Sequence, residues 1–215
     1  FAAAVKTDIQ DSSVYGVIAG GAELGMTSSD DYLNKDKAAN REAYLNYVAA
    51  NFELLGNPSD QAMSGAHTVL EMETRLAGSS LTPVEMADPN KLFTAMTMEE
   101  LESLLSNFDL QTYLEAIGLP AVGKVTVFDR KKLAELNRVL KDYSLADIKI
   151  LLRWSVLRQL KKALSPVFDA SGMAYLNARY GKIEQLPRSE QVTLLVPTLF
   201  GHPLSQLYVD EYFTG

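Results

Sequence analysis

The sequence of 215 residues has no cysteine, only two histidines and no long apolar run. Without cysteine, the chain can form no disulfide bond and no thiolate zinc site, and it offers no cysteine nucleophile. Because no stretch of about 18 or more consecutive apolar residues occurs, no segment is predicted to span a membrane. A hydrophobic fraction of 47% nevertheless predicts a globular chain rather than a disordered one.

Three glycines, Gly20, Gly21 and Gly25, follow the apolar run VYGVI and raise the question of a phosphate-binding loop. Such loops need G-x-G-x-x-G at the start of a helix or G-x-x-x-x-G-K-[ST], and this stretch has neither. Gly25 is followed by Met26, with no lysine to reach a phosphate. We therefore predict a backbone turn with positive φ at Gly20 and Gly21, and no nucleotide site.

Candidate catalytic and metal-binding side chains are few. His67 and Glu71 lie four residues apart and would share a helix face, a spacing that two metal ligands can use. The helical zinc motif H-E-x-x-H is absent, however, so an ordinary hydrogen bond on the helix surface is the simpler interpretation. Three acid pairs are interpreted as solvated surface carboxylates: Asp30/Asp31, Glu71/Glu73 and Glu99/Glu100. The sequence thus predicts no catalytic, cofactor-binding or metal-binding residue in this chain.

Charge divides the chain into two halves. Residues 1–120 carry a net charge of −12 and residues 121–215 a net charge of +5, for a total of −7. The basic residues concentrate between 130 and 162, where a nucleic-acid-binding surface would be one hypothesis. Acids are interleaved among them and the total charge repels phosphate, which favours a solvated face or one that pairs with the acidic half. We expect no nucleic-acid partner.

The pattern of apolar residues and turn signals predicts an all-α protein, mainly a helical, bundle-like lobe. Residues 3–18 contain two short apolar runs around DSS and predict a small β-hairpin near the N-terminus. From Asp30 the apolar period becomes helical, and KVTVF at 124–128 is the one later strand candidate. We therefore expect residues 1–29 to form a hairpin and turn, and residues 30–215 to form a helical body, together a single lobe.

Helix boundaries are predicted from capping residues. Gly56 is expected to end a first helix and Asn57 to cap the next, and Thr97 begins the capping box TMEE. Further caps are expected at Asp109, Asp129 and Ser144, and helical turns within 166–181, 188–199 and 203–213. The helix that follows Ser144 has apolar residues all round, so we predict that it is covered on more than one side, with Trp154 in the core.

Motifs in the same order resemble the amino-terminal part of the neprilysin family of zinc metallopeptidases. They are AGGAELGM followed by DDYL, ETRLAGSSLTPVEMADP at 73–89, MTMEEL at 96–101, FDLQTYLEAIGLP at 108–120, LLRWSVL at 151–157 and HPLSQLYVDEYF at 202–213. Two departures stand out. Phe93, Thr94 and Ala95 replace the family's Y-N-K, and only Arg188 is kept from a basic stretch near 188–191.

The resemblance implies a role without catalytic residues. Members of the family carry H-E-x-x-H and a downstream glutamate in a carboxyl-terminal catalytic domain, which holds the zinc, and a helical domain covers the cleft. The present motifs match the helical region only. Residues 1–215 are thus expected to be a fragment of a larger metalloendopeptidase, non-catalytic alone, with zinc in the parent and the missing catalytic domain as its partner.

Two further expectations follow from the resemblance. The lobe would enclose the cavity and restrict substrates to short peptides, in a parent that is periplasmic or secreted. The alternative from the residues alone is a stand-alone helical protein-interaction module. The two hypotheses differ in surface: a lobe should expose apolar residues meant for its partner, whereas a self-sufficient module should bury them.

Overall fold

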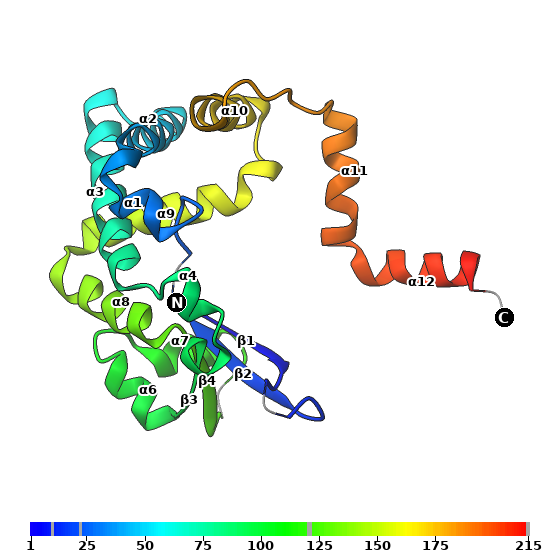
Figure 1. The fold of residues 1–215 in the computed structure, drawn as a ribbon. Coiled ribbons are helices and arrows are strands. Elements are labelled where there is room, and N and C mark those ends of the chain that lie inside the picture. Colours follow the sequence, from blue (N-terminus) through cyan, green and yellow to red (C-terminus); the bar gives the residue numbers. More distant parts are fainter. Residues whose placement is uncertain (10, 22, 120–121, 214–215) are drawn as a thin grey trace. The chain divides into compact units, whose positions relative to one another are not determined.

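The computed structural model describes residues 1–9, 11–21, 23–119 and 122–213, and it divides into two compact units. The first unit is Phe1–Arg179 and the second is Tyr180–Gly215. Of the described residues, 66% are helical, and a four-stranded sheet is present, which confirms the predicted fold class (Figure 1). Among the described residues, no helix has both the length and the apolar character that a membrane crossing requires.

The sheet has the strand order β1-β2-β4-β3. Strands β1 (Ala2–Thr7) and β2 (Tyr15–Gly20) are antiparallel and form the predicted hairpin. Strand β4 (Lys124–Phe128), also predicted, pairs with β2 in parallel. Strand β3 (Phe93–Thr97) pairs antiparallel with β4 and was not predicted from the sequence. The segment that departs from the neprilysin family's Y-N-K is therefore the start of an edge strand.

One face of the sheet is buried against the helices. Val17 of β2 lies opposite Val125 of β4, and Ala19 lies opposite Val127. All four side chains are buried, because alternate residues of a strand point to the same face. This register attaches the hairpin to the helical core.

The helices of the first unit are α1 (Ser29–Leu33), η1 (Lys35–Lys37), α2 (Ala38–Leu54), α3 (Ser59–Ser79), α4 (Pro83–Met86), α5 (Pro89–Leu92), α6 (Met98–Leu104), α7 (Leu110–Ala116), α8 (Arg130–Asp142), α9 (Leu145–Leu160), η2 (Lys161–Ala163) and α10 (Pro166–Tyr180). The second unit contains α11 (Arg188–Leu199) and α12 (Gly201–Tyr212). The helical turns predicted within 166–181, 188–199 and 203–213 are thus present.

The predicted caps are largely confirmed. Thr97 accepts a hydrogen bond from the Glu100 amide in a capping box, and Asp109 and Ser144 accept the equivalent bonds in their helices. Gly56 follows α2 with φ of 90°, a conformation that glycine adopts without strain. The prediction for Asn57 is wrong, because the N-cap of α3 is Pro58, which provides no side-chain hydrogen bond.

The core of the first unit is formed where α2 and α3 pack together beside α9. Trp154 of α9 is fully buried there, with its ring 5.3 Å from that of Tyr47 and 6.3 Å from that of Phe52. Its predicted place in the core is confirmed. Aromatic edges meeting at these distances stabilise the contact beyond the area they bury.

The predicted cover around α9 is incomplete. Its buried residues are Leu151, Trp154 and Leu157, and they lie on one side of the helix. Leu152 and Val156, on the opposite side, are more than half exposed. Within the described residues of the first unit, the expectation that α9 is covered on more than one side is therefore wrong.

Candidate functional site

A buried carboxylate, Glu73 of α3, lies at the centre of a polar network in the core. Its Oε2 accepts hydrogen bonds from the hydroxyls of Tyr32, at 2.7 Å, and Tyr44, at 2.8 Å. The Tyr44 hydroxyl in turn accepts a hydrogen bond from Nε1 of Trp154 at 2.7 Å. The Tyr32 hydroxyl accepts one from the amide of Met26 at 2.8 Å. Five segments, namely α1, α2, α3, α9 and the stretch before α1, are thus joined in one network around this carboxylate.

The electrostatics of this network favour a structural role. Burial raises the pKa of Glu73, although the hydrogen bonds from Tyr32 and Tyr44 oppose that rise. Burial and the nearby carboxylate also raise the pKa of both tyrosines above the ordinary value of 10. The carboxylate is enclosed at 2% exposure and already has its donors, so no substrate can reach it for proton transfer.

The glycine-rich stretch is held against this network. Arg158 of α9 donates hydrogen bonds to the carbonyls of Glu23, at 3.1 Å, and Leu24. A Cβ at Gly25 would lie 1.7 Å from the Tyr44 hydroxyl, so the backbone approaches the ring as only glycine allows.

The turn predicted at Gly20 and Gly21 is wrong in its geometry. Among the described residues, positive φ at glycine occurs at Gly56, Gly118 and Gly181 only. Gly20 instead ends strand β2, where extended backbone is required. The stretch serves close packing, at Gly25, rather than a left-handed turn.

A second buried carboxylate, Asp31 of α1, connects the start of the helical body to α10. It accepts a 2.5 Å hydrogen bond from Nη2 of Arg179 and a 3.2 Å one from Nδ2 of Asn40, and it pairs with Lys37 at 3.3 Å. Burial alone would raise the pKa of Asp31, but these donors lower it overall. The predicted solvation of Asp31 and Glu73 is therefore wrong, because both carboxylates are buried with partners from distant segments.

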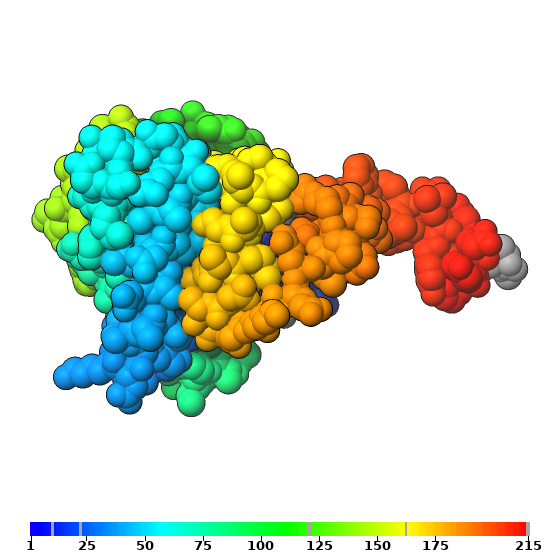
Figure 2. All heavy atoms as spheres, turned by 90° about the horizontal axis from the view of Figure 1, so that it is seen from above, coloured from blue at the N-terminus to red at the C-terminus, as the bar shows by residue number. Residues whose placement is uncertain are grey.

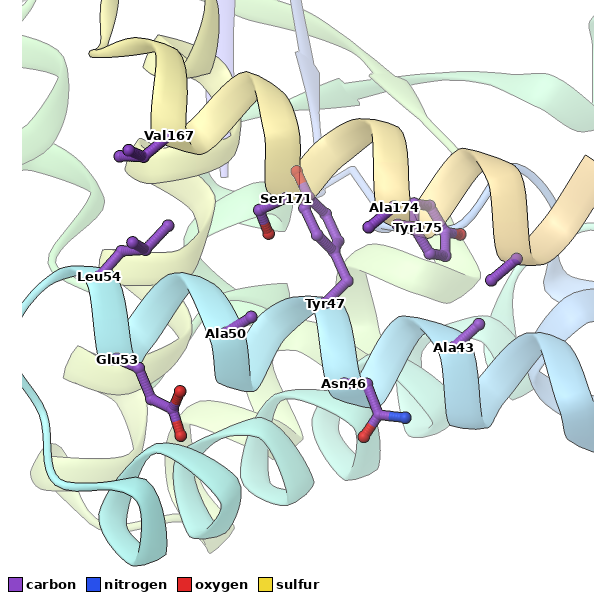
Figure 3. A pocket seen from close by; sticks show the side chains of 11 residues that line it. Ala43, Asn46, Tyr47, Ala50, Glu53, Leu54, Val167, Ser171, Ala174 and Tyr175 are labelled. Carbon is purple, nitrogen blue, oxygen red and sulfur yellow. The ribbon is translucent and has the colours of Figure 1, made fainter. Parts of the chain in front are cut away.

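A groove of about 610 Å³ runs between α2 and α10. Figure 2 shows α10, in yellow, lying directly against α2, in blue to cyan. In Figure 3, Tyr47 and Tyr175 lie between the two helices, and their rings stack at 4.9 Å. Nδ2 of Asn51 donates to the Ser171 hydroxyl at 2.9 Å. Glu53 is the one charged residue among the described residues of the lining, so the groove offers shape and apolar surface but no acid–base pair.

The other candidates from the sequence do not form a site. The Glu71 carboxylate accepts a 2.7 Å hydrogen bond from the hydroxyl of Tyr143, and among the described residues it forms none with His67. In the described ranges, no group of three or more histidine, aspartate or glutamate side chains could hold a metal ion. Part of the basic segment forms ion pairs with the acidic half of the chain, as one of the two favoured interpretations predicts. Lys131 contacts Glu85 at 3.2 Å.

The second unit has a different character, because neither α11 nor α12 contains a buried residue. Its exposed large apolar side chains are Tyr180, Ile183, Leu186, Val192, Leu194, Leu199, Phe200, Leu204, Leu207, Tyr208, Val209, Tyr212 and Phe213. Such a concentration of exposed apolar surface marks an interaction surface.

Comparison with known proteins identifies the class to which this helical fold belongs. A family profile described as Peptidase family M13 matches residues 1–215, and the chain belongs to that family. Membrane metallo-endopeptidase-like 1 of Homo sapiens is 28% identical over 98% of this chain. Endothelin-converting enzyme 1 of Rattus norvegicus is 23% identical over 99% of it, and neprilysin of Mus musculus is 23% identical over 98%. The resemblance drawn from the motifs is confirmed.

Solved structures share the fold. The zinc metalloprotease Zmp1 of Mycobacterium tuberculosis, in its open state, matches 99% of this chain with a TM-score of 0.90 and 24% identity. PepO from Lactobacillus rhamnosis matches 100% of it with a TM-score of 0.77 and 15% identity. The match covers 33% and 34% of those chains. This chain likewise spans 29% to 31% of the length of the curated relatives named above.

Proposed function

We propose that this chain is the amino-terminal helical lobe of a neprilysin-like zinc metalloendopeptidase, and that it covers the active-site cavity of the parent enzyme. The single observation that carries the proposal is the second unit, whose two helices bury none of their residues. Membership of Peptidase family M13 and the partial coverage of longer relatives support it.

The argument from the second unit is energetic. Removing apolar surface from water contributes about 25 cal/mol per Å², and two helices without a core gain almost none of it. Isolated helices of about 12 residues are marginal in water even with favourable sequences. Exposed side chains such as Leu194, Leu207 and Tyr212 therefore support contact with a further part of the polypeptide. A self-sufficient interaction module would bury most of them.

The chemistry of the parent would come from zinc held outside this chain, where a bound metal ion polarises the scissile carbonyl and activates water. The contribution of the present residues would be steric: a lobe with a packed core limits which peptides enter the cavity. The buried network around Glu73 would keep that lobe rigid, since it fixes α1, α2, α3 and α9 to one carboxylate. The residues 1–215 would then act as one lobe of the enzyme.

Metal content and peptide cleavage test the proposal. The parent protein and the 215-residue chain would be purified separately, and zinc would be measured by atomic emission alongside cleavage of peptides of increasing length. We expect zinc and cleavage of short peptides in the parent, and neither in the 215-residue chain. Stoichiometric zinc or peptidase activity in the 215-residue chain would sink the proposal.

The parent gene provides the control. Translation past Gly215 should contain H-E-x-x-H, whose two histidines bind zinc in the family, and a downstream glutamate that is the third ligand. A stop codon directly after Gly215 would instead favour the stand-alone interaction module.

A further inference from the structure

Helix α9 has a second apolar face that no described residue of the first unit, Phe1–Arg179, covers. Leu152, Val156 and Leu160 are 57%, 56% and 52% exposed, and they follow one another at intervals of four residues. Residues at this spacing form a straight ridge along a helix, the kind of ridge that fits a groove of a second helix. The ridge is therefore shaped for a helical partner.

The ridge borders an apolar groove of about 630 Å³. Leu55 at the end of α2 and Leu164 after η2 extend the apolar surface beyond α9 itself. The polar residues of the lining are Lys149 and Arg153 alone, among those that the structure describes. A groove of this composition favours an occupant with an apolar face.

The two cations at the border have no carboxylate within ion-pairing distance among the described residues, although Asp60 lines a neighbouring groove with both. Lys149 and Arg153 lie one helical turn apart, and neither forms an ion pair within the described residues. Arg153 only reaches Oδ1 of Asn57 at 3.3 Å and lies over the ring of Phe52. Cations beside an apolar groove attract acidic side chains that flank the apolar face of a partner.

We propose that this groove on α9 is the seat of an amphipathic helix, supplied by the parent polypeptide outside residues 1–215, whose apolar face is bordered by aspartate or glutamate. The inference rests on the proposed function, since the parent must supply the helix. The relatives are about three times as long as the matched segment, which leaves ample chain for it. This surface is distinct from α11 and α12.

A charge placed on the ridge tests the proposal. The Val156→Asp variant would be compared with Val84→Asp, at a valine that is 84% exposed on the four-residue helix α4, which offers no long ridge. In the 215-residue chain both variants should keep the midpoint of thermal unfolding within about 2 °C. In the parent, Val156→Asp should lower it by about 4 °C or more, and Val84→Asp should not.

Reversal of charge tests the acidic border separately. Lys149→Glu should not change the thermal stability of the 215-residue chain, because the new carboxylate can pair with Arg153, four residues later on the helix. In the parent, Lys149→Glu should lower the midpoint of thermal unfolding, because the new carboxylate would face the acidic residues that flank the bound helix. The decrease should be larger at low salt than at high salt. Lys35→Glu, on the exposed turn η1, is the matched control.

Several outcomes would overturn the inference. One is a Val156→Asp effect in the parent no larger than that of Val84→Asp. Another is a Val156→Asp effect that already appears in the 215-residue chain, because the ridge would then be covered by this chain itself. If the 215-residue chain dimerises and Val156→Asp abolishes the dimer, the occupant of the groove is a second copy of the chain. If that chain binds anionic vesicles and the same variant abolishes the binding, the occupant is a lipid surface. If no longer parent protein exists, the proposed function itself fails. If the parent exists but Val156→Asp has no specific effect in it, only the inference about the groove fails.

Discussion

Helices α3 and α12 illustrate two ways in which this chain uses apolar residues. Helix α3 buries one face completely, including Val69, Met72 and Leu76, against its neighbours in the first unit. Helix α12 has apolar residues at comparable density, among them Leu207 and Tyr212, and buries none. The difference teaches that helical spacing of apolar residues predicts a helix but not where its cover lies. In the first unit the cover comes from this chain, and in the second we infer that it comes from elsewhere.

The largest expected effect is at Gly25, where the backbone lies directly against the side chain of Tyr44. The Gly25→Ala variant should lose about 4 kcal/mol of its free energy of unfolding, because a Cβ must displace Tyr44 and break its bond to Glu73. Urea unfolding followed by tryptophan fluorescence measures the loss at Trp154. Gly123→Ala, where a Cβ meets nothing within 4 Å, should change the free energy by less than about 0.5 kcal/mol. Equal effects would contradict the close approach.

The buried ion pair between Arg179 and Asp31 should have the next largest effect. Arg179→Met leaves the Asp31 carboxylate buried without its main donor, which should cost about 3 kcal/mol of stability. Arg138→Met, which removes an ion pair from a side chain that is 65% exposed, should cost less than about 1 kcal/mol. The same urea titration distinguishes them, and a loss below about 1 kcal/mol for Arg179→Met would mean that α10 does not depend on this pair.

The pH dependence of stability sharpens the contrast at Glu73. Burial raises the folded-state pKa of Glu73 above the ordinary 4.5. The stability that the protonated carboxyl contributes is therefore fully present below pH 4.5 and is lost as the pH rises through the raised pKa. Glu73→Gln cannot ionise, so its free energy of unfolding should rise relative to that of the wild type as the pH increases from 4 to 8. Paired urea titrations across that range measure the difference, with the exposed Glu71→Gln as control. A difference that stays constant with pH would contradict the raised pKa.

The smallest effect is expected in the second unit. Leu207→Ala removes apolar atoms that are already in water, so the 215-residue chain should change its stability by less than about 0.5 kcal/mol. The corresponding Leu76→Ala change in α3 should cost about 3 kcal/mol, because it leaves a cavity. A large loss in both variants would mean that α12 is covered within this chain, and the contrast between the units would fail.

The local features of the fold were predictable from the sequence. Capping residues such as Thr97, Asp109 and Ser144 act on amides three positions away, so the sequence carries their full context. The hairpin around DSS is equally local: Ser13 donates its amide to the Asp11 carboxylate in the turn.

Features that depend on distant partners were not predictable. Strand β3 exists only because β4, about 30 residues later, supplies its hydrogen bonds, and its five residues carry no strong strand pattern. Asp31 was interpreted as a surface acid because its donor Arg179 lies 148 residues away. Glu73 was misjudged for the same reason, since Tyr32 is 41 residues from it. An isolated sequence does not indicate which acid such a donor will reach.

Amide hydrogen exchange tests the central claim most directly. In the 215-residue chain, we predict that amides of α3 are protected while those of α11 and α12 exchange within seconds, because the latter helices have no core. In the parent protein, both sets should be protected. Strong protection of α11 and α12 in the 215-residue chain, or their exchange within seconds in the parent, would contradict the account of this chain as a lobe completed by a further domain.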